Sequence, residues 1–399
     1  MAGGFVGGTG IAYPVPLTQI GIAIETAKGT LEAAPSYVIK TKAPKYKPDQ
    51  TYLPDDTLQG SMVKTYDEIL GLRYDSHGWD SYPYLDSFPI LLCCEFGSTD
   101  TVTTAPTATT VATAATAGSD TLALTSGASY VANSIFTVGS GATLETHVVE
   151  SVSSNTVTLT YPLVFDQAAG ATVTGLTSHK FSLLNTGTGQ PPSVSLWDYD
   201  GEEWRTMTAC QLDELMMKGT ATALDDYTCT WFGNAAALNA SAPSVSVTDV
   251  QTIAPWTVQI AIGGTAVSTV VDWEFTFKRG VKPIPALTGT QEYFEYFADA
   301  IEATGKLTFV EQSGSPYLAA YEAGTTQSLD FRMWDSASGN LLRYFCTRAK
   351  FTTGELDRSK EWVEVVVDVQ LLPSAADATA GGVSPGAWTV GNSVTTPYH

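Results

Sequence analysis

The fold is decided by residues 190–234, which read QPPSVSLWDYDGEEWRTMTACQLDELMMKGTATALDDYTCTWFGN. Residues 193–197 alternate polar and apolar side chains, as a half-buried strand does, and a turn follows at Asp200-Gly201. Residues 204–217 form a longer strand whose alternation slips around residues 212–216, which indicates a β-bulge. A third strand over residues 227–232 stops at Gly233. The stretch therefore predicts consecutive strands and no catalytic constellation.

Composition extends this prediction to the whole chain. Of the 399 residues, 44% are hydrophobic and only 15% are charged, so the surface must rely on Thr, Ser, Gly and Asn. Many short alternating segments then favour an all-β protein with one or two short helices. The clearest helix candidate runs from Tyr82 to Leu92, with Ser81 as its cap, and Pro89 indicates that it is short or kinked.

The composition changes abruptly at Thr99. Residues 99–178 contain no Lys or Arg and are dominated by Thr, Ala, Val, Ser and Gly. We interpret them as a small β-module inserted into a host domain and projecting from its outer surface. The expected parts are an N-terminal arm (1–19), the host domain (20–98 and 180–373), the module (99–179) and a C-terminal tail (374–399) that becomes ordered only against a neighbour.

Charge limits the possible partners. The chain carries 41 acidic and 20 basic residues, for a net charge of −21, so it lacks the cationic surface with which proteins grip phosphates. Three interpretations of the acidity stay open: solubility, self-repulsion tolerated in a rigid assembly, and a surface that does not hold DNA.

The side chains that usually carry chemistry are scattered. We expect the histidines to be surface or terminal residues and the cysteines to be buried thiols, with Cys210 and Cys229 as the only plausible disulfide pair. The acidic doublets at residues 55–56 and 225–226 are expected at turns rather than at a divalent ion. No apolar run approaches the ~20 residues of a membrane helix. We predict no enzymatic activity, no metal, no cofactor and no membrane contact.

Two segments suggest contacts between subunits. Prolines exclude a helix around the one basic cluster, which either pairs with acids of a neighbouring subunit or forms a solvated loop; its members are Lys40, Lys42, Lys45 and Lys47. Residues 52–79 have the length and mixed polarity of an extended hairpin or clamp.

The order of several motifs resembles the major tail tube proteins of long non-contractile-tailed bacteriophages. The resemblance covers residues 18–98 and 180–373. It rests on the opening strand Ile20–Thr30, the Pro191-Pro192 strand, the turn at residues 197–199, the phrase Cys210-Gln-Leu-Asp-Glu-Leu215, the strand returning to Gly233, and the closing strands at residues 348–368.

The resemblance implies a tail-tube-type β-sandwich with a flanking helix, whose subunits form hexameric rings that stack into an acidic-lined conduit for DNA passage into the host. A lumen of carboxylates would repel phosphates at short range, so that DNA slides without being held. Partners would be other copies of the chain, a tape-measure protein and tail-terminator and tip proteins, while DNA passes without specific binding. Such a protein is made in the host bacterial cytoplasm and resides in the virion tail. Candidate lumen or inter-subunit acids are Glu203, Asp213, Asp226, Glu274, Asp330, Glu364 and Asp368.

Two other function classes remain open at this point. A phage or surface β-protein could recognise glycan or host surface through the inserted module, with Trp197, Trp204 or Trp231 as sugar-stacking platforms. A carbohydrate-active enzyme would need a carboxylate pair, and none stands out in the sequence.

Overall fold

The computed structural model describes residues 18–57, 59–97, 100–239, 247, 250–313, 316–379 and 381–399. Antiparallel strands dominate these residues, so the prediction of an all-β chain is confirmed. The described residues contain two short α-helices, α1 (Pro89–Phe96) and α2 (Tyr317–Ala323). The arm expected at residues 1–19 lies outside the described residues except for its last two.

The long strand β13 (Trp204–Thr220) belongs to two sheets. Its first half pairs with β12 (Val194–Tyr199) and β15 (Ala237–Asn239). Its second half pairs with β14 (Ala223–Gly233) and β18 (Val270–Lys278). β13 is therefore the element through which the two sheets are joined.

A β-bulge separates the two halves of β13. Thr208 and Ala209 both lie opposite Ser195, and Ala209 has a φ of +52°, which a non-glycine residue rarely adopts. The buried carboxylate of Glu25 holds this geometry. It accepts hydrogen bonds from the Ala209 amide (2.8 Å), the Ser193 hydroxyl (2.7 Å) and the Ser195 hydroxyl (3.2 Å).

A second bulge lies further along β13 and confirms the predicted slip. Leu212 and Glu214 face consecutive residues of β14, and Asp213 is the extra residue between them. Asp213 also binds the residues that follow β18. Its carbonyl accepts a hydrogen bond from the Arg279 amide at 2.8 Å, and its carboxylate accepts one from the Val281 amide at 2.6 Å.

The main sheet continues on both sides of β13. Its first seven strands run in the order β3–β4–β14–β13–β18–β21–β25, where the new members are β3 (Lys45–Asp55), β4 (Asp67–Ser81), β21 (Glu302–Val310) and β25 (Glu364–Leu371). Beyond β25, two strands pair with different parts of it: β24 (Glu355–Asp357) and β23 (Leu341–Phe351). From β23 the sheet goes on through β22 (Thr326–Trp334), β16 (Gln259–Ile262) and β17 (Thr265–Val267).

The smaller sheet and the helix α1 enclose the core. β12 pairs with β1 (Gln19–Ile24), which pairs with β2 (Tyr37–Ile39), and all residues of α1 are buried beside β13. The expected helix from Tyr82 with a Ser81 cap is wrong, because Ser81 ends β4 and the helix begins only at Pro89. A proline without an N–H costs nothing in the first turn, so it starts the helix instead of kinking it.

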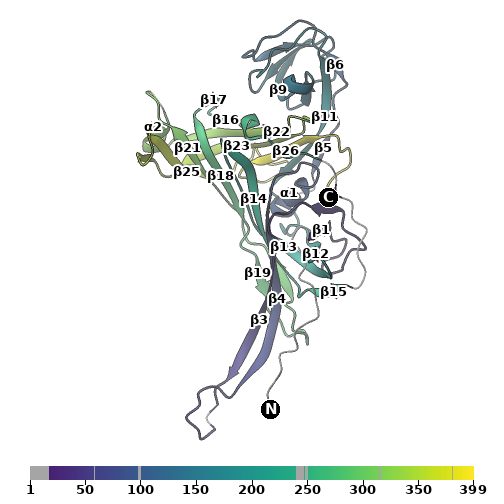
Figure 1. Ribbon diagram of the computed structural model, residues 1–399, viewed down its shortest axis with the longest axis vertical. Coiled ribbons are helices and arrows are strands. Elements are labelled where there is room, and N and C mark those ends of the chain that lie inside the picture. Colours follow the sequence, from purple (N-terminus) through teal and green to yellow (C-terminus); the bar gives the residue numbers. More distant parts are fainter. Residues whose placement is uncertain are drawn as a thin grey trace.

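Residues 109–176 form a module with an apolar core of its own (Figure 1). Its strands are β6 (Thr109–Thr110), β7 (Thr121–Ala123), β8 (Ile135–Val138), β9 (Glu145–Ser153), β10 (Thr156–Leu159) and the start of β11 (Thr172–Ser182). β11 crosses the boundary expected at residue 179. It pairs with β6 and β8 inside the module, and then with β5 (Thr101–Thr103) and β26 (Ala387–Asn392) in the body.

The C-terminal segment is part of the body, which corrects the prediction of a tail that needs a neighbour for order. β26 pairs with both β11 and β23. Its Trp388 and Val390 are fully buried, and the Tyr398 ring packs 5.0 Å from the His179 ring. This strand was not predicted from the sequence, because β26 is only six residues long and lies within a segment rich in small residues.

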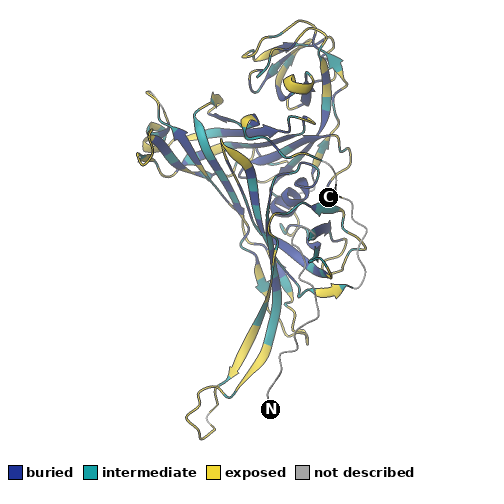
Figure 2. Ribbon diagram, in the orientation of Figure 1, coloured by how far each residue is buried: buried dark blue, intermediate teal, exposed yellow. Residues whose placement is uncertain are grey.

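β3 and β4 form a hairpin that extends far beyond the rest of the main sheet (Figure 1). Its base is covered, whereas its distal half is exposed along both strands (Figure 2). We call the distal part, residues 52–55 and 67–70, the hairpin arm. β19 (Lys282–Ile284) and β20 (Glu295–Phe297) form a separate two-stranded sheet. Two 3-10 turns lie within the described residues, Gly141–Thr143 and Pro255–Thr257.

Replacing Glu25 with alanine should destabilise the chain strongly, because the amide of Ala209 and its neighbours lose a charged acceptor inside the protein. We expect the free energy of unfolding to fall by about 3 kcal/mol. Urea denaturation followed by tryptophan fluorescence measures this. Glu202→Ala, on an exposed turn, is the matched control and should change stability by less than about 0.5 kcal/mol. Equal effects of the two substitutions would contradict the role given to Glu25.

Candidate functional site

One face of the main sheet is polar from β14 to β25. The other face of the same strands packs into the core with residues such as Met217, Phe275, Leu307 and Val367, all of them buried. Because side chains alternate along a strand, the residues between these point away from the core. We call this outward side the polar face.

Charges alternate in sign across the polar face. One row runs straight across five neighbouring strands and consists of Asp226, Lys218, Glu274, Lys306 and Asp368. Each lysine of this charged row lies opposite an acid on either side, an arrangement that stabilises a sheet. The row therefore carries nearly balanced charge, although the chain as a whole is strongly acidic.

A second row repeats the alternation and an uncharged row lies between the two. Glu214, Lys278 and Glu302 are consecutive cross-strand neighbours, and the Lys278 ammonium lies 3.0 Å from the Glu214 carboxylate. The intervening row has short or uncharged side chains, namely Thr228, Met216, Thr276, Thr304 and Gln370. The polar face thus offers no patch of one sign.

Three of the seven candidate acids lie together on the polar face: Asp226, Glu274 and Asp368 belong to the charged row. Asp213 is close by but is committed to the Val281 amide, and burial raises the pKa of its carboxyl. Glu203 lies apart, in the turn between β12 and β13, 4.0 Å from the Arg205 guanidinium.

The other two candidate acids are bound inside the subunit. The carboxylate of Asp330 accepts two hydrogen bonds from Arg343, at 2.8 and 2.6 Å, and both residues are buried. Glu364 is 2% exposed, and its carboxylate is held by Lys360 at 2.9 Å and by the Trp362 indole at 2.8 Å. Alternation predicts which side of a strand a residue occupies, but not whether another layer covers that side.

The basic cluster divides into two pairs. Lys42 forms an ion pair with Asp226 and lies 3.6 Å above the Tyr82 ring, while the Lys40 ammonium donates to the Val250 carbonyl at 3.0 Å. Lys45 and Lys47 are exposed on one side of β3. The expected loop is therefore wrong for these two lysines, because β3 is an edge strand and tolerates the neighbouring prolines.

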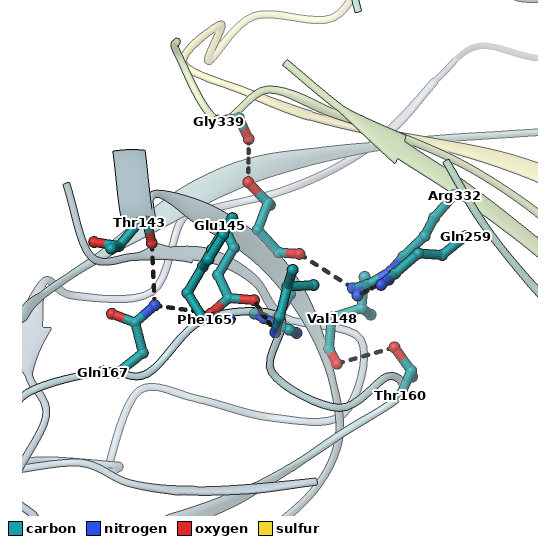
Figure 3. Close-up of polar contacts among 12 residues, drawn as sticks. Thr143, Glu145, Val148, Thr160, Phe165, Gln167, Gln259, Arg332 and Gly339 are labelled. Carbon is teal, nitrogen blue, oxygen red and sulfur yellow. Dashed lines mark hydrogen bonds and ion pairs between the residues drawn. The ribbon is translucent and has the colours of Figure 1, made fainter. Parts of the chain in front are cut away.

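The module is fixed to the body by buried polar contacts (Figure 3). Arg332 of β22 is completely buried: its guanidinium donates to Gln259 (2.7 Å) and to the Thr146 carbonyl in the module (3.1 Å). The Thr146 hydroxyl in turn donates a hydrogen bond to the Gly339 carbonyl of the body at 2.6 Å. Burial lowers the pKa of Arg332 to about 10. Together with the shared strand β11, this network attaches the module to the body.

Three of the four histidines are buried against carboxylates, which corrects the expectation of surface positions. His77 contacts Asp198 at 3.0 Å, His147 contacts Glu145 at 2.9 Å, and His179 contacts Asp100 at 2.6 Å. The partners of His77 and His179 are more than 70 residues away in the chain, so no local motif could have revealed them.

The cysteines and the other possible metal ligands form neither a disulfide nor a metal-binding group in the described part of the chain. All five cysteines are free and buried. Cys229 lies opposite Leu215, not Cys210, so the plausible pair is not a disulfide. No group of three or more His, Cys, Asp or Glu side chains is arranged to hold a metal ion, and no helix is long and apolar enough to cross a membrane, among the residues described.

Asp225 is a buried acid that sequence reasoning assigned to a turn. It is 1% exposed, and neither carboxylate oxygen has a hydrogen-bond partner among the described residues. A Cβ atom at Gly219 would lie 1.8 Å from this carboxylate, so only glycine fits beneath it. Burial and the adjacent Asp226 raise the pKa of Asp225 to about 7.

This shift predicts a pH-dependent stability. The folded chain holds the Asp225 proton more tightly than the unfolded chain, whose pKa is near 3.8, so the stabilisation is complete below pH 4 and is lost as the pH rises through 7. Asp225→Asn should therefore raise the free energy of unfolding at pH 8 by an amount on the order of 4 kcal/mol. At pH 4 it should have little effect. Urea titrations at both pH values test this, and a pH-independent difference would contradict it.

Comparison with known proteins agrees with this architecture. A family model described as "Phage tail tube protein" matches residues 154–384, from the turn between β9 and β10 inside the module to the loop before β26. No curated protein matches the chain. Since the matched segment is more than half of the chain and contains most of the main sheet, the chain belongs to the phage tail tube protein family and is a structural component of the phage tail.

Proposed function

We propose that this protein forms hexameric rings that stack into the tail tube, and that the polar face lines the channel through which DNA passes. The observation that carries the proposal is the main sheet itself. It is a broad antiparallel surface whose inner side is sealed by aromatic and aliphatic residues and whose outer side carries hydroxyls and alternating charges. The wall of a tube needs such a sheet, with one face that water wets and an opposite face that packs against an apolar core.

The charge pattern suits a surface along which DNA slides. Lys218 and Lys306 each lie opposite an acidic residue on either side, and these acids offset the positive charge that a phosphate would meet. Phosphate binding gains its free energy from lysine and arginine patches that release counterions, and this face has none. The net charge of −21 on each subunit adds a weak repulsion that is screened beyond about 8 Å at physiological salt.

The hairpin arm supplies a means of stacking. It carries exposed apolar residues on a two-stranded ribbon that extends away from the body (Figure 2), and an isolated ribbon of this kind is at best marginally stable in water. Contact with another copy would bury it. The module, at the opposite end of the view in Figure 1, is placed on the outer wall in this proposal.

The same proposal includes the remaining partners. During assembly the channel would enclose a tape-measure protein, and the two ends of the tube would contact tail-terminator and tip proteins. The subunits would be made in the bacterial cytoplasm before they join the virion. Adhesion to glycan has less support, because Trp197, Trp204 and Trp231 are buried and offer no stacking platform.

Negative-stain electron microscopy of the purified full-length chain tests the assembly. We expect rings or tubes with a stain-filled centre as the protein concentration rises, and a persistent monomer at high concentration would refute it. Glu364→Ala is a useful companion variant, because it removes an acid bound inside the subunit and should lower stability without changing the form of the rings.

Cysteine labelling tests which face lines the channel. Thr276→Cys lies in the uncharged row of the polar face, and Thr113→Cys lies at an exposed position of the module. In assembled tubes, both should react with a small maleimide, but only the module cysteine should react with a maleimide on a large polymer. Free subunits should react at both sites with both reagents. Equal polymer labelling of the two variants in tubes would place the polar face outside.

A further inference from the structure

The hairpin arm combines apolar and acidic side chains in a fixed order. Leu53 lies directly opposite Ile69, and they are 53% and 59% exposed. Two residues further along the same face, Asp55 lies opposite Asp67. The two rungs are about 7 Å apart, since a strand advances about 3.4 Å per residue. This face therefore presents an apolar rung followed by a rung of carboxylates.

The body contains a pocket of complementary character. Its volume is about 460 Å³, and it lies where the ends of β21 and β25 meet residues 183–190 and 297–301. Its lining includes Ile301, Ala303 and Leu371. At its edge Phe297 and Val383 are 42% and 43% exposed, so the apolar surface continues out of the pocket to solvent. Large apolar side chains left in water at the mouth of a pocket mark a contact surface.

The lining of this pocket also contains a buried cation. Arg279 is only 3% exposed; one amino group donates to the Gly189 carbonyl at 3.0 Å, and its Nε has no hydrogen-bond partner among the described residues. Burial raises the pKa of the nearby Glu95 well above its usual range, so Glu95 is a poor counterion. Asp299 at the rim is paired with Lys282 at 2.6 Å. Arg279 thus lacks a direct ionic partner within the described part of the subunit.

A guanidinium of this kind gains most from a carboxylate that arrives together with apolar surface, because exclusion of water strengthens the ion pair. The chain itself carries a segment with that chemistry. The hairpin arm of the same copy extends away from its own body (Figure 1), which leaves its tip free for another molecule.

We propose that this pocket receives the hairpin arm of a second copy of the chain, with the Leu53–Ile69 rung against the apolar lining and the Asp55–Asp67 rung directed toward Arg279. The inference rests on the proposed function, because it names the surface through which one copy would hold the next. The contact is heterologous, since a pocket and an arm are different surfaces, and such contacts generate open stacks when they do not close into a ring.

Disulfide or bismaleimide cross-linking between two single-cysteine variants tests the contact. Leu53→Cys is mixed with Val383→Cys or with Phe297→Cys, and the mixture is assembled before cross-linking. The native cysteines are buried, so they contribute little background. Leu356→Cys, on the short strand β24 and 37% exposed, is the matched control for an exposed apolar position outside the pocket. Covalent dimers are expected with the two pocket cysteines and not with the control.

A blocking variant provides a second measurement. Ala300 lies at the exposed rim, so Ala300→Trp should fill the mouth without disturbing the fold, and should shift assembly to at least tenfold higher protein concentration. Arm–pocket dimers together with impaired assembly of the blocked variant would support the inference. Tubes that form normally with the pocket filled, and without cross-links, would overturn it while leaving the proposed function intact. Failure of the unmodified chain to form any ring or tube would instead refute the proposed function.

Discussion

The fold depends on one strand that belongs to two sheets. β13 can leave the small sheet and enter the large one only because an extra residue near Ala209 rotates the strand, and this backbone geometry is costly without a partner. The Glu25 carboxylate, which follows the end of β1, supplies that partner, and β1 is separated from β13 by the single strand β12. A single buried acid therefore connects the N-terminal strand β1 to β13. The second half of β13 then pairs on both sides within the main sheet, where it contributes to the polar face.

Charge has two separate roles in this chain. On the polar face, acids and lysines lie opposite each other on neighbouring strands, so the surface is wettable and its charges largely offset one another. In the interior, charged groups join parts of the subunit: Arg332 attaches the module, and the Asp330–Arg343 pair links β22 to β23. Some acidic residues therefore lie on the polar face, whereas others are buried in ion pairs. Their total number bears on the solubility of the chain, but it does not predict which of them line a surface.

The sequence predicted part of the site and missed part for identifiable reasons. Asp226, Glu274 and Asp368 lie on one face of the sheet because each occupies the outward position of a clearly alternating strand, while their place at a lumen or a subunit contact stays a prediction. The lysines that alternate with them were not recognised, since cross-strand neighbours depend on register, which is not visible in a single strand. Asp330 has the same alternation, but its ion pair with Arg343 on the neighbouring strand β23 also depends on register and is not visible in β22 alone.

The sequence by itself determined the local chemistry: an all-β chain, a bulged strand at residues 204–217, a long hairpin, and a composition without a catalytic or phosphate-binding cluster. These follow from side-chain alternation, turn residues and charge, all of which act over a few residues. Only the tertiary structure decided that the C-terminal segment enters the sheet as β26, that β11 is shared by module and body, and that buried histidines meet their acids. Such contacts join residues far apart in the chain, and their stability comes from burial that exists only after the sheets have packed.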